Sequence, residues 1–330
     1  MQVGIVGAGA VGGAIAALLS RAGHDVEVTA RGEHLEAIQN NGIHLTGAWG
    51  EYTARVQAGS VLTRSPELVI VATKAQDAVE AIYDNLRLLR GVPVLVVQNG
   101  LDSLTNAKAA SPGSDIVGGL ASFASSYISP GEINVTAAGP TYLGVVGERD
   151  LPARYTAHIL DAVMPTSLVP NFSGAQWTKL VVNQINALQA ITGLSAQEVI
   201  AHPQLRRIMT ASMRENVRIA FAGRVRFEKL NGLDNRGLRL FSLLPLWIGQ
   251  LLPTMMSARM GTVPNPGSTL QSISRGRSTE IDALNGAVVR AAAKLKRVAP
   301  INAKLVELVH EVEASGTFLT EDEVVARFER

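Results

Sequence analysis

Three polar side chains recur at helical spacing in the segment WTKLVVNQIN, which covers residues 177–186. Lys179, Asn183 and Asn186 stand at i, i+4 and i+7, so in a helix of about 100° per residue they share one face. An ammonium group can give a proton to a developing alkoxide, and two amides can bind a carboxylate or hydroxyl without competing charge. Because the neighbouring residues are mostly apolar, we favour a catalytic surface over an ordinary solvated stripe.

A second candidate site is the glycine-rich turn near the start of the chain. It directly follows the β-rich run VGIV and opens a helical segment that ends at Gly23. In this context Gly7 suits a tight turn, Gly9 lets a pyrophosphate approach, and Gly12 allows close helix packing. The turn therefore predicts a dinucleotide site rather than a plain glycine turn, with contacts from Gly7, Ala8, Gly9, Ala10, Val11 and Gly12.

Polar residues also follow the next three β-rich runs. Arg31 stands where an NAD-binding fold places an acidic residue for the adenosine ribose, and a guanidinium there suits a 2′-phosphate. The sequence thus favours NADPH over NADH, the alternative being that Arg31 is a solvated loop cation. Lys74 either caps its own helix or contacts the cofactor, and we expect Asn99 to contact nicotinamide or substrate rather than only form a turn.

A third cluster combines Ser268 with the segment STEID at 278–282. Serine, threonine and acidic residues in this order are also typical of a helix start, with Ser278 or Thr279 as the cap and Glu280 in the first turn. On local pattern alone the helix start is the preferred interpretation.

The elements that must position these residues form an α/β pattern. Short β-rich runs alternate with helical segments at 2–6, 25–30, 68–73 and 94–98, which predicts a parallel, doubly wound sheet. Between about 117 and 146 the chain alternates polar and apolar residues around a Ser-Pro-Gly turn, and we expect antiparallel strands that finish the same sheet.

Beyond residue 170 the strand signals fade and helical patterns dominate. They cover residues 175–200, 204–222, 277–298 and 301–314. A chain of 330 residues suits two domains. We therefore expect an NADP-binding domain at 1–167 and a helical domain for substrate binding and dimerisation at 168–330.

Composition excludes several kinds of chemistry. Thirty Lys and Arg face 28 Asp and Glu, and the net charge of +2 provides no basic surface for nucleic acid. The chain has no cysteine, which excludes disulfides, thiolate metal sites and a cysteine nucleophile. The six histidines lack metal-ligand spacing, so we expect neither a metal nor a histidine base.

The segment at 240–258 is uncharged over 19 residues and is nearly long enough for a membrane span. Pro245, Gln250 and Pro253 make it a poor lipid-facing helix, so we favour a kinked helix in a domain core or dimer interface. No secretory signal precedes the first β-rich run, and we expect a cytoplasmic protein.

In order and spacing these segments resemble the ketopantoate reductase (2-dehydropantoate 2-reductase) family over most of the chain. The matching stretches are GAGAVG at 7–12, Arg31 with GEHLEAI, Lys74, QNG at 98–100, the Pro-Gly pair at 130–131, WTKLVVN at 177–183, Ser268 with TEID at 279–282, and PIN at 300–302. The resemblance implies a Rossmann domain and an all-helical domain of the 6-phosphogluconate-dehydrogenase-like type, with the active site in the cleft between them.

The same resemblance implies that NADPH reduces the 2-keto group of ketopantoate to pantoate, a step of pantothenate and coenzyme A biosynthesis. Lys179 would then be the general acid, and Glu280 would contact both cofactor ribose and substrate. The other implied substrate ligands are Asn183, Asn186 and Ser268, and the other implied cofactor ligands are Arg31, Lys74, Asn99 and Ala124.

Two other functions fit parts of the pattern. One is a related NADP-dependent dehydrogenase acting on a bulkier keto or imino substrate, as in opine formation, with the apolar turn at 120–123 and the stretch at 240–252 lining a larger pocket. The other is a non-catalytic NADPH sensor, which would have no need for a proton donor such as Lys179.

Overall fold

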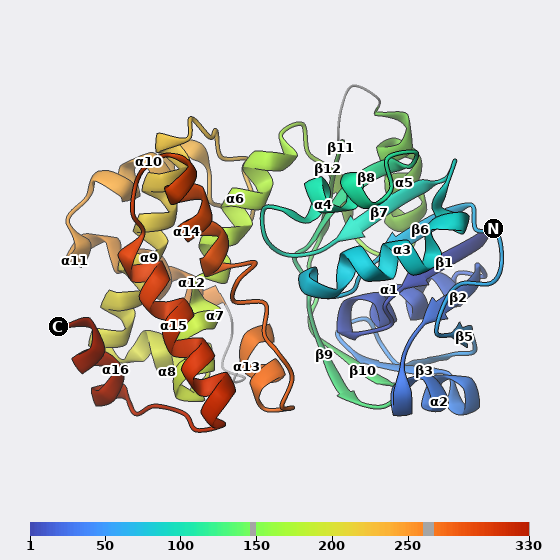
Figure 1. The fold of residues 1–330 in the computed structure, drawn as a ribbon, viewed down its shortest axis with the longest axis horizontal. Coiled ribbons are helices and arrows are strands. Elements are labelled where there is room, and N and C mark those ends of the chain that lie inside the picture. The colour runs from blue at the N-terminus through green and yellow to red at the C-terminus, as the bar shows by residue number, and fades with distance from the viewer. Residues whose placement is uncertain (146–149, 260–266, 330) are drawn as a thin grey trace. The chain divides into compact units, whose positions relative to one another are not determined.

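The computed structural model describes residues 1–145, 150–259 and 267–329 and divides into two compact units, Met1–Phe172 and Ser173–Arg330 (Figure 1). The predicted boundary between 167 and 168 falls inside the strand β12 (Thr166–Leu168), which pairs with β11 (Thr141–Val145). Because β12 extends the main sheet, the first unit continues to Phe172.

The first unit contains an eight-stranded sheet in its described residues, with the order β12-β11-β8-β7-β6-β1-β2-β5. The remaining strands of this sheet are β1 (Gln2–Val6), β2 (Asp25–Thr29), β5 (Gln57–Gly59), β6 (Leu68–Val71), β7 (Pro93–Val97) and β8 (Asp115–Ala121). Strands β5, β2, β1, β6, β7 and β8 are parallel, and β11 is antiparallel to β8. The predicted doubly wound sheet is confirmed.

Helices cover both faces of this sheet. They are α1 (Ala10–Arg21), α2 (Gly32–Asn41), η1 (Ala75–Asp77), α3 (Ala78–Leu89), α4 (Ser103–Ala110) and α5 (Leu151–Asp161). Successive residues of β6 alternate between two apolar cores, since Leu68 and Ile70 pack with α1 and α5 while Val69 and Val71 pack with α3 and α4. Burial on both faces explains why these strands are continuous apolar runs.

A second, four-stranded sheet has the order β4-β3-β10-β9. Its strands are β3 (Ile43–Gly47), β4 (Tyr52–Ala54), β9 (Ala124–Ser129) and β10 (Glu132–Ala137). The expectation that all strands after 117 finish the first sheet is therefore wrong for β9 and β10. These strands pack on α1, where a Cβ atom at Gly13 would lie 3.0 Å from Ile133 Cγ1, so α1 is buried between the two sheets.

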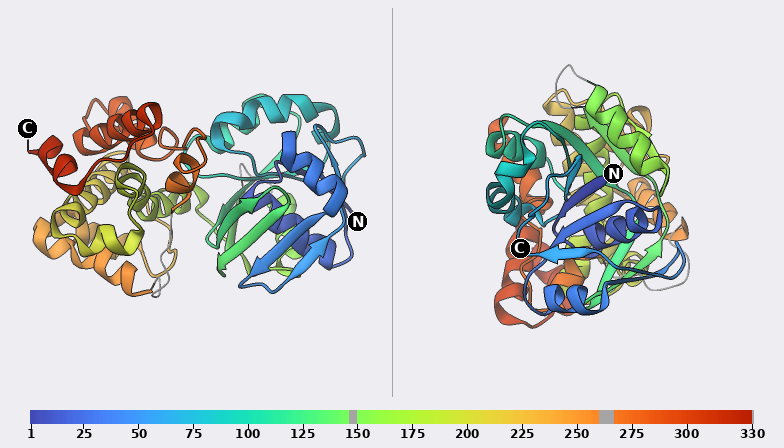
Figure 2. Two further views of the ribbon diagram at one scale, coloured as in Figure 1. Left: turned by 90° about the horizontal axis from the view of Figure 1, so that it is seen from below. Right: turned by 90° about the vertical axis from the view of Figure 1, so that its right-hand side faces the viewer.

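The second unit consists of helices in its described residues (Figure 2). They are α6 (Phe172–Asn183), α7 (Ile185–Thr192), α8 (Ala196–Ala201), α9 (Pro203–Ala222), α10 (Asn235–Leu243), α11 (Leu246–Gly249), α12 (Leu251–Arg259), α13 (Ser268–Ile273), α14 (Asn285–Lys294), α15 (Pro300–Ser315) and α16 (Glu321–Phe328). The predicted all-helical domain is confirmed, and α9 packs against most of the other helices.

One helical prediction in this unit needs correction. Residues 278–280 are irregular and 281–284 form turns, and α14 begins only at Asn285, so Ser278 and Thr279 do not cap a helix. Instead, the Thr279 N–H donates to Glu313 Oε1 on α15 at 2.6 Å, which fixes these turns to another helix. The helical pattern predicted at 175–200 is present as three successive helices, because the chain turns at Gln184 and again before Ala196.

The uncharged segment at 240–258 lies in α10, α11 and α12, and Pro245 separates the first two of these helices. The predicted kink is present, but burial in a core is wrong for much of the segment. Several large apolar side chains are exposed, among them Leu240, Leu243, Trp247, Leu251 and Met255. Among the residues described, no helix combines the length and apolarity that a membrane crossing requires.

Candidate active site

The carboxyl ends of four parallel strands bring most of the predicted cofactor ligands to one edge of the main sheet. β1 has β2 on one side and β6 on the other, so the strand order reverses at β1. Gly7, Arg31, Lys74 and Asn99 follow β1, β2, β6 and β7 respectively. An open parallel sheet binds ligands at such a point of reversal, so the structure assembles these residues where a dinucleotide would bind.

The three glycines of the first turn have different surroundings. Gly7 has a φ of +98°, and a Cβ atom there would lie 2.9 Å from Thr73 N. At Gly12 an added Cβ would collide with the Gly7 carbonyl oxygen. At Gly9, by contrast, φ is −65° and no atom lies within 4 Å of an added Cβ. Gly7 and Gly12 are therefore needed for the backbone and its packing, whereas Gly9 leaves open space.

This open space lies at the first turn of α1, for which Gly9 is the N-cap residue and no side chain caps the helix. The N–H groups of a first helical turn have no partner within the helix and favour an anion. A pyrophosphate fits this combination of open space and N–H donors. Residues Ala8, Ala10 and Val11 supply neighbouring backbone, and the Ala8 N–H itself donates to Thr29 O at 2.9 Å.

His34, for which the sequence predicted no role, binds the same turn from α2. Its Nε2 lies 2.7 Å from Ala8 O, and its Nδ1 lies 3.0 Å from the Gly131 N–H. The carbonyl can only accept and the N–H can only donate, so in these two hydrogen bonds Nε2 is the donor and Nδ1 the acceptor. His34 therefore links the glycine-rich turn to the hairpin between β9 and β10, a contact across 97 residues that no local pattern indicates.

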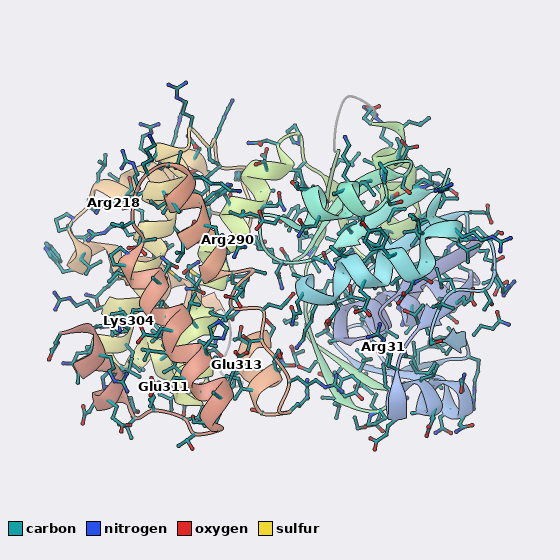
Figure 3. The ribbon with its side chains drawn as sticks, viewed as in Figure 1. Arg31, Arg218, Arg290, Lys304, Glu311 and Glu313 are labelled. Carbon is teal, nitrogen blue, oxygen red and sulfur yellow. The ribbon has the colours of Figure 1, made fainter. Side chains whose placement is uncertain are left out.

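Arg31 lies at the N-cap of α2 and is well exposed (Figure 3). Its Nη2 is 3.8 Å from Asp84 Oδ2, a long and exposed ion pair that holds the guanidinium only weakly. Lys74 takes the backbone position of the N-cap of η1, without a side-chain cap bond. Asn99 is half-buried beside Gly100, and Ala124 begins β9 shortly after the carboxyl end of β8.

In the second unit, Lys179 and Asn183 lie on α6 and Asn186 lies on α7. All three are partly exposed, whereas their neighbours Leu180 and Val181 are buried. Burial lowers the pKa of Lys179 to about 8, and the nearby negative charge of Glu280 opposes that shift. The structure therefore brings Lys179 and Glu280 together across about 100 residues of sequence and gives the lysine an unusually acidic ammonium group.

Asn186 lies beside the start of α13. A Cβ atom at Gly267 would be 2.5 Å from Asn186 Oδ1, and the Gly267 N–H donates to Gln189 Oε1 at 2.8 Å. Ser268, the first residue of α13, is exposed next to this contact. The predicted substrate ligands Asn186 and Ser268 therefore come from adjacent elements.

A buried amide network lies behind this surface and was not predicted. Gln184 Oε1, at the junction of α6 and α7, accepts from Ser212 Oγ and, at 2.7 Å, from Asn285 Nδ2. Asn285 Nδ2 also donates to Asn302 Oδ1 at 3.0 Å, and Asn302 Nδ2 donates to Glu215 Oε2 at 2.7 Å. The network joins the end of the helix that carries Lys179 to the helix that follows Glu280.

In the described part of the chain, no group of three or more histidine, aspartate or glutamate residues is arranged to hold a metal ion. The polar groups on these surfaces are therefore ammonium, amide, hydroxyl, guanidinium and carboxylate groups. Such groups can bind an anionic substrate and a dinucleotide and can transfer a proton.

Two family models match the chain. "Ketopantoate reductase PanE/ApbA" matches residues 3–148, and "Ketopantoate reductase PanE/ApbA C terminal" matches residues 171–313. The chain belongs to the ketopantoate reductase family. It is therefore an oxidoreductase that uses a nicotinamide cofactor, and the two matches cover parts of both structural units.

Other members of the ketopantoate reductase family are similar over nearly the whole chain. The 2-dehydropantoate 2-reductase of Pyrococcus horikoshii is 27% identical over 319 residues, which cover 96% of this chain and 99% of the relative. That of Archaeoglobus fulgidus is 28% identical over 319 residues, covering 95% and 98%.

Solved structures show the same fold. A PanE/ApbA family ketopantoate reductase from Ralstonia eutropha JMP134 has a TM-score of 0.81 and 27% identity, covering 95% of this chain and 99% of that one. A D-mandelate dehydrogenase in complex with NADH and anilino(oxo)acetate has a TM-score of 0.82 at 21% identity, covering 96% and 99%. At this identity the second likeness concerns the fold alone.

Proposed function

We propose that this protein catalyses the NADPH-dependent reduction of a 2-keto acid, with 2-dehydropantoate (ketopantoate) as the leading substrate and pantoate as its product. The observation that carries the proposal is Lys179, a partly buried lysine whose pKa is lowered to about 8, on the same helix as Asn183. The relatives named 2-dehydropantoate 2-reductase support the choice of substrate.

The cofactor side of the proposal rests on the first unit. Gly9 and the first turn of α1 would hold the pyrophosphate, and Arg31 would hold the 2′-phosphate that distinguishes NADPH from NADH. Lys74, Asn99 and Ala124 would contact the remainder of the cofactor. NADPH bound there supplies the hydride.

The proton side rests on the second unit. Reduction of the ketone builds negative charge on its oxygen, and Lys179 Nζ would donate the proton that neutralises it. With a pKa of about 8, Lys179 is mostly protonated at neutral pH yet gives up its proton more readily than an ordinary lysine. Asn183, Asn186 and Ser268 would bind the carboxylate and hydroxyl groups, and Glu280 would keep Lys179 protonated and contact the ribose.

The direct test is the rate of NADPH oxidation by the purified protein with ketopantoate and other 2-keto acids. We expect turnover with wild-type protein and a fall of about 10²- to 10⁴-fold in kcat for Lys179→Met, with NADPH binding retained. Lys294→Met is the matched control, because Lys294 is an exposed lysine on α14. Absence of turnover with every 2-keto acid would refute the proposal, and undiminished turnover in Lys179→Met would remove Lys179 from the mechanism.

Cofactor preference is tested separately with Arg31→Ala. We expect NADPH to bind about ten- to a hundredfold more weakly while NADH binding changes little, since a charged hydrogen bond to phosphate contributes roughly 1.5–3 kcal/mol. The control is Arg90→Ala. It removes the same charge at the C-terminal end of α3, away from the carboxyl edge of the sheet. Equal losses for both cofactors would contradict the phosphate role.

A further inference from the structure

Glu280 lies in a stretch of turns and irregular backbone between α13 and α14. On its C-terminal side local bonds define the backbone, because the N–H groups of Ala283 and Leu284 both donate to Glu280 O, at 2.9 and 3.0 Å. The fully buried side chains of Ile281 and Leu284 anchor this side in the apolar interior. On its N-terminal side the neighbouring residue, Thr279, is bonded to another helix, so the position of Glu280 also depends on that bond.

Glu313 on α15 is the partner of Thr279 (Figure 3). Its Oε1 accepts from the Thr279 N–H at 2.6 Å, and Thr279 is itself buried. A buried N–H without a partner is costly, and a carboxylate is a strong acceptor for it. Burial opposes ionisation of Glu313, but the bonds from Thr279 and His310 outweigh burial and lower the pKa of its carboxyl group. Glu313 is therefore ionised at neutral pH and holds the residue directly before Glu280.

His310 lies one turn earlier on α15 and connects Glu313 to the other side of Glu280. Its Nδ1 lies 2.7 Å from Glu313 Oε2, and its Nε2 lies 3.3 Å from each of the two carboxylate oxygens of Asp282. Carboxylate oxygens can only accept, so the two contacts are both hydrogen bonds only when each ring nitrogen carries a proton. Burial lowers the pKa of His310, but the bonds to Glu313 and Asp282 outweigh burial and raise it above its usual value.

The charged groups that surround His310 in the described part of the chain come from three elements. Glu313 lies on α15, Asp282 follows Glu280 in the turn, and Arg290 lies on α14, where its Nη1 donates to Asp282 O at 2.9 Å (Figure 3). The two carboxylates favour the charged form of His310, and the arginine opposes it. A neutral imidazole has a single N–H, so one of the two bonds is lost as the pH rises through the pKa of His310.

We propose that Glu313 and His310 are positioning residues for Glu280: from α15 they hold the turn that carries it. This keeps the Glu280 carboxylate close to the Lys179 ammonium group. The proposal rests on the proposed function, in which Lys179 donates the proton to the keto oxygen. Glu313 bonds the residue before Glu280 and His310 bonds Asp282, two residues after it, so the carboxylate lies between two points that are fixed to one helix.

A purely structural role is the competing explanation, because the bond from Thr279 to Glu313 also fastens α15 to the turn. The two explanations differ in what they predict for Lys179. A loss of stability alone leaves the acidity of Lys179 unchanged as long as the protein is folded, whereas a loss of position lets Glu280 move away. The attraction of Glu280 opposes the effect of burial on Lys179, so a weaker attraction lowers the pKa of Lys179 further.

The test measures the pKa of Lys179 in the folded protein without substrate or cofactor. NMR titration of protein labelled with carbon-13 at lysine Cε gives this pKa, and Lys179→Met assigns the signal. In Glu313→Ala we expect the pKa of Lys179 to fall by about 0.5 or more, because the turn is released and the attraction of Glu280 weakens. Glu313→Asp keeps the charge on a side chain one carbon shorter, and it should give a smaller fall if Glu313→Ala does not fold.

Two further variants separate position from charge. Glu313→Gln removes the same charge as Glu313→Ala but keeps an oxygen that can accept from the Thr279 N–H, so the pKa of Lys179 should stay within about 0.2 of its wild-type value. Glu311→Ala is the control on the same helix, since Glu311 forms a partly exposed ion pair with Arg327. It should leave the pKa of Lys179 unchanged.

The double variant shows whether Glu313 acts through Glu280. In the Glu280→Gln background, Glu313→Ala should cause no further change in the pKa of Lys179. His310→Gln should lower this pKa by about 0.2–0.3, less than Glu313→Ala, because the bond from Thr279 to Glu313 remains. In turnover assays, the ratio of kcat/KM at pH 9 to kcat/KM at pH 7 should be about two- to threefold lower in Glu313→Ala than in the wild type.

The outcomes distinguish this proposal from the proposed function. An unchanged pKa of Lys179 in Glu313→Ala, or an equal fall in Glu313→Gln, would overturn the positioning role, and ketopantoate reduction by the wild type would still support the proposed function. An unchanged pKa in His310→Gln would overturn the role of His310. If the wild type reduces no 2-keto acid, the proposed function fails, and the NMR titration still decides whether Glu313 positions Glu280 beside Lys179.

Discussion

The lowered pKa of Lys179 makes pH the most informative perturbation of this enzyme. With a pKa of about 8, the ammonium group is about nine-tenths protonated at pH 7 and about one-tenth protonated at pH 9. If Lys179 donates the proton to the keto oxygen, kcat/KM should be level below about pH 8 and fall about tenfold per pH unit above it. An ordinary lysine would keep the rate level to above pH 10.

The assay follows NADPH consumption with ketopantoate from pH 6 to pH 10, at saturating cofactor. Glu280→Gln should move the fall in kcat/KM to lower pH, because the Glu280 charge raises the pKa of Lys179. Lys294→Met should keep the wild-type profile, since Lys294 is an exposed lysine of α14. The residual activity of Lys179→Met should lack the inflection near pH 8.

Stability gives a second measure of the same titration that does not depend on turnover. The folded protein holds Lys179 at a pKa below that of the unfolded chain, so the unfolded chain binds more protons between about pH 8 and 10.5. The free energy of unfolding of the wild type minus that of Lys179→Met should therefore increase with pH between about pH 8 and 10.5. Below pH 8 this difference should be at its lowest value and should not change with pH. The difference should be of order 1–3 kcal/mol, discounted for the part of the side chain that reaches solvent. An inflection near pH 8 that persists in Lys179→Met, with no change in relative stability, would refute the reasoning.

Further predictions follow from the glycine-rich turn and the amide network. Gly9→Ala should change the free energy of unfolding by no more than about 0.5 kcal/mol but should weaken NADPH binding about tenfold or more, because the added Cβ enters the open space. Gly12→Ala should lower the free energy of unfolding by about 2 kcal/mol or more, because its Cβ collides with Gly7 O. Equal stability of the two variants in urea denaturation would be inconsistent with this packing. Asn302→Ala should lower the free energy of unfolding by about 3 kcal/mol, because Asn302 forms hydrogen bonds with buried polar partners on other elements. The control is Lys304→Ala, two residues along the same helix, which removes only an exposed ion pair and should change the free energy of unfolding by about 0.5 kcal/mol or less. A cost for Asn302→Ala as small as that of its control would show that the network is not a stabilising one.

Features that depend on local spacing could be predicted from the sequence. The glycine-rich turn, the parallel strands and the face shared by Lys179 and Asn183 follow from periods of two and 3.6 residues and from the conformational freedom of glycine. The reversal of strand order at β1 could also be expected, because right-handed crossover connections restrict where β6 can join the sheet. These features bring the predicted cofactor ligands to one edge.

Features that depend on distant pairing could not be predicted. β9 and β10 have the alternation of ordinary antiparallel strands, and nothing in their own residues indicates that they leave the main sheet to pair with β3. The hydrogen bonds of His34 and Gln184 could not be predicted either, since their partners lie 97 and 101 residues away in the sequence. Contacts of this kind are decided by which surfaces remain to be covered once the main sheet has formed.

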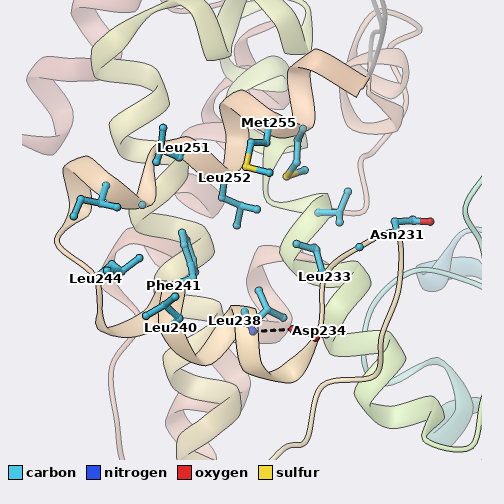
Figure 4. A pocket seen from close by; sticks show the side chains of 16 residues that line it. Asn231, Leu233, Asp234, Leu238, Leu240, Phe241, Leu244, Leu251, Leu252 and Met255 are labelled. Carbon is cyan, nitrogen blue, oxygen red and sulfur yellow. Dashed lines mark hydrogen bonds between the residues drawn. The ribbon is translucent and has the colours of Figure 1, made fainter.

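The uncharged segment at 240–258 shows why composition alone misleads. Its length and apolarity suggested a kinked helix in a domain core or dimer interface. Its backbone is held by charged residues from another helix: Arg218 Nε donates to Ser242 O at 3.0 Å, and Arg214 Nη1 donates to Leu244 O at 3.1 Å. These arginines lie on α9 and bond the carbonyl groups at the end of α10, just before Pro245 interrupts the chain. A segment fixed through its backbone can leave its apolar side chains unburied, and that is the condition under which α10 and α12 can line an open cavity beside Val182 (Figure 4).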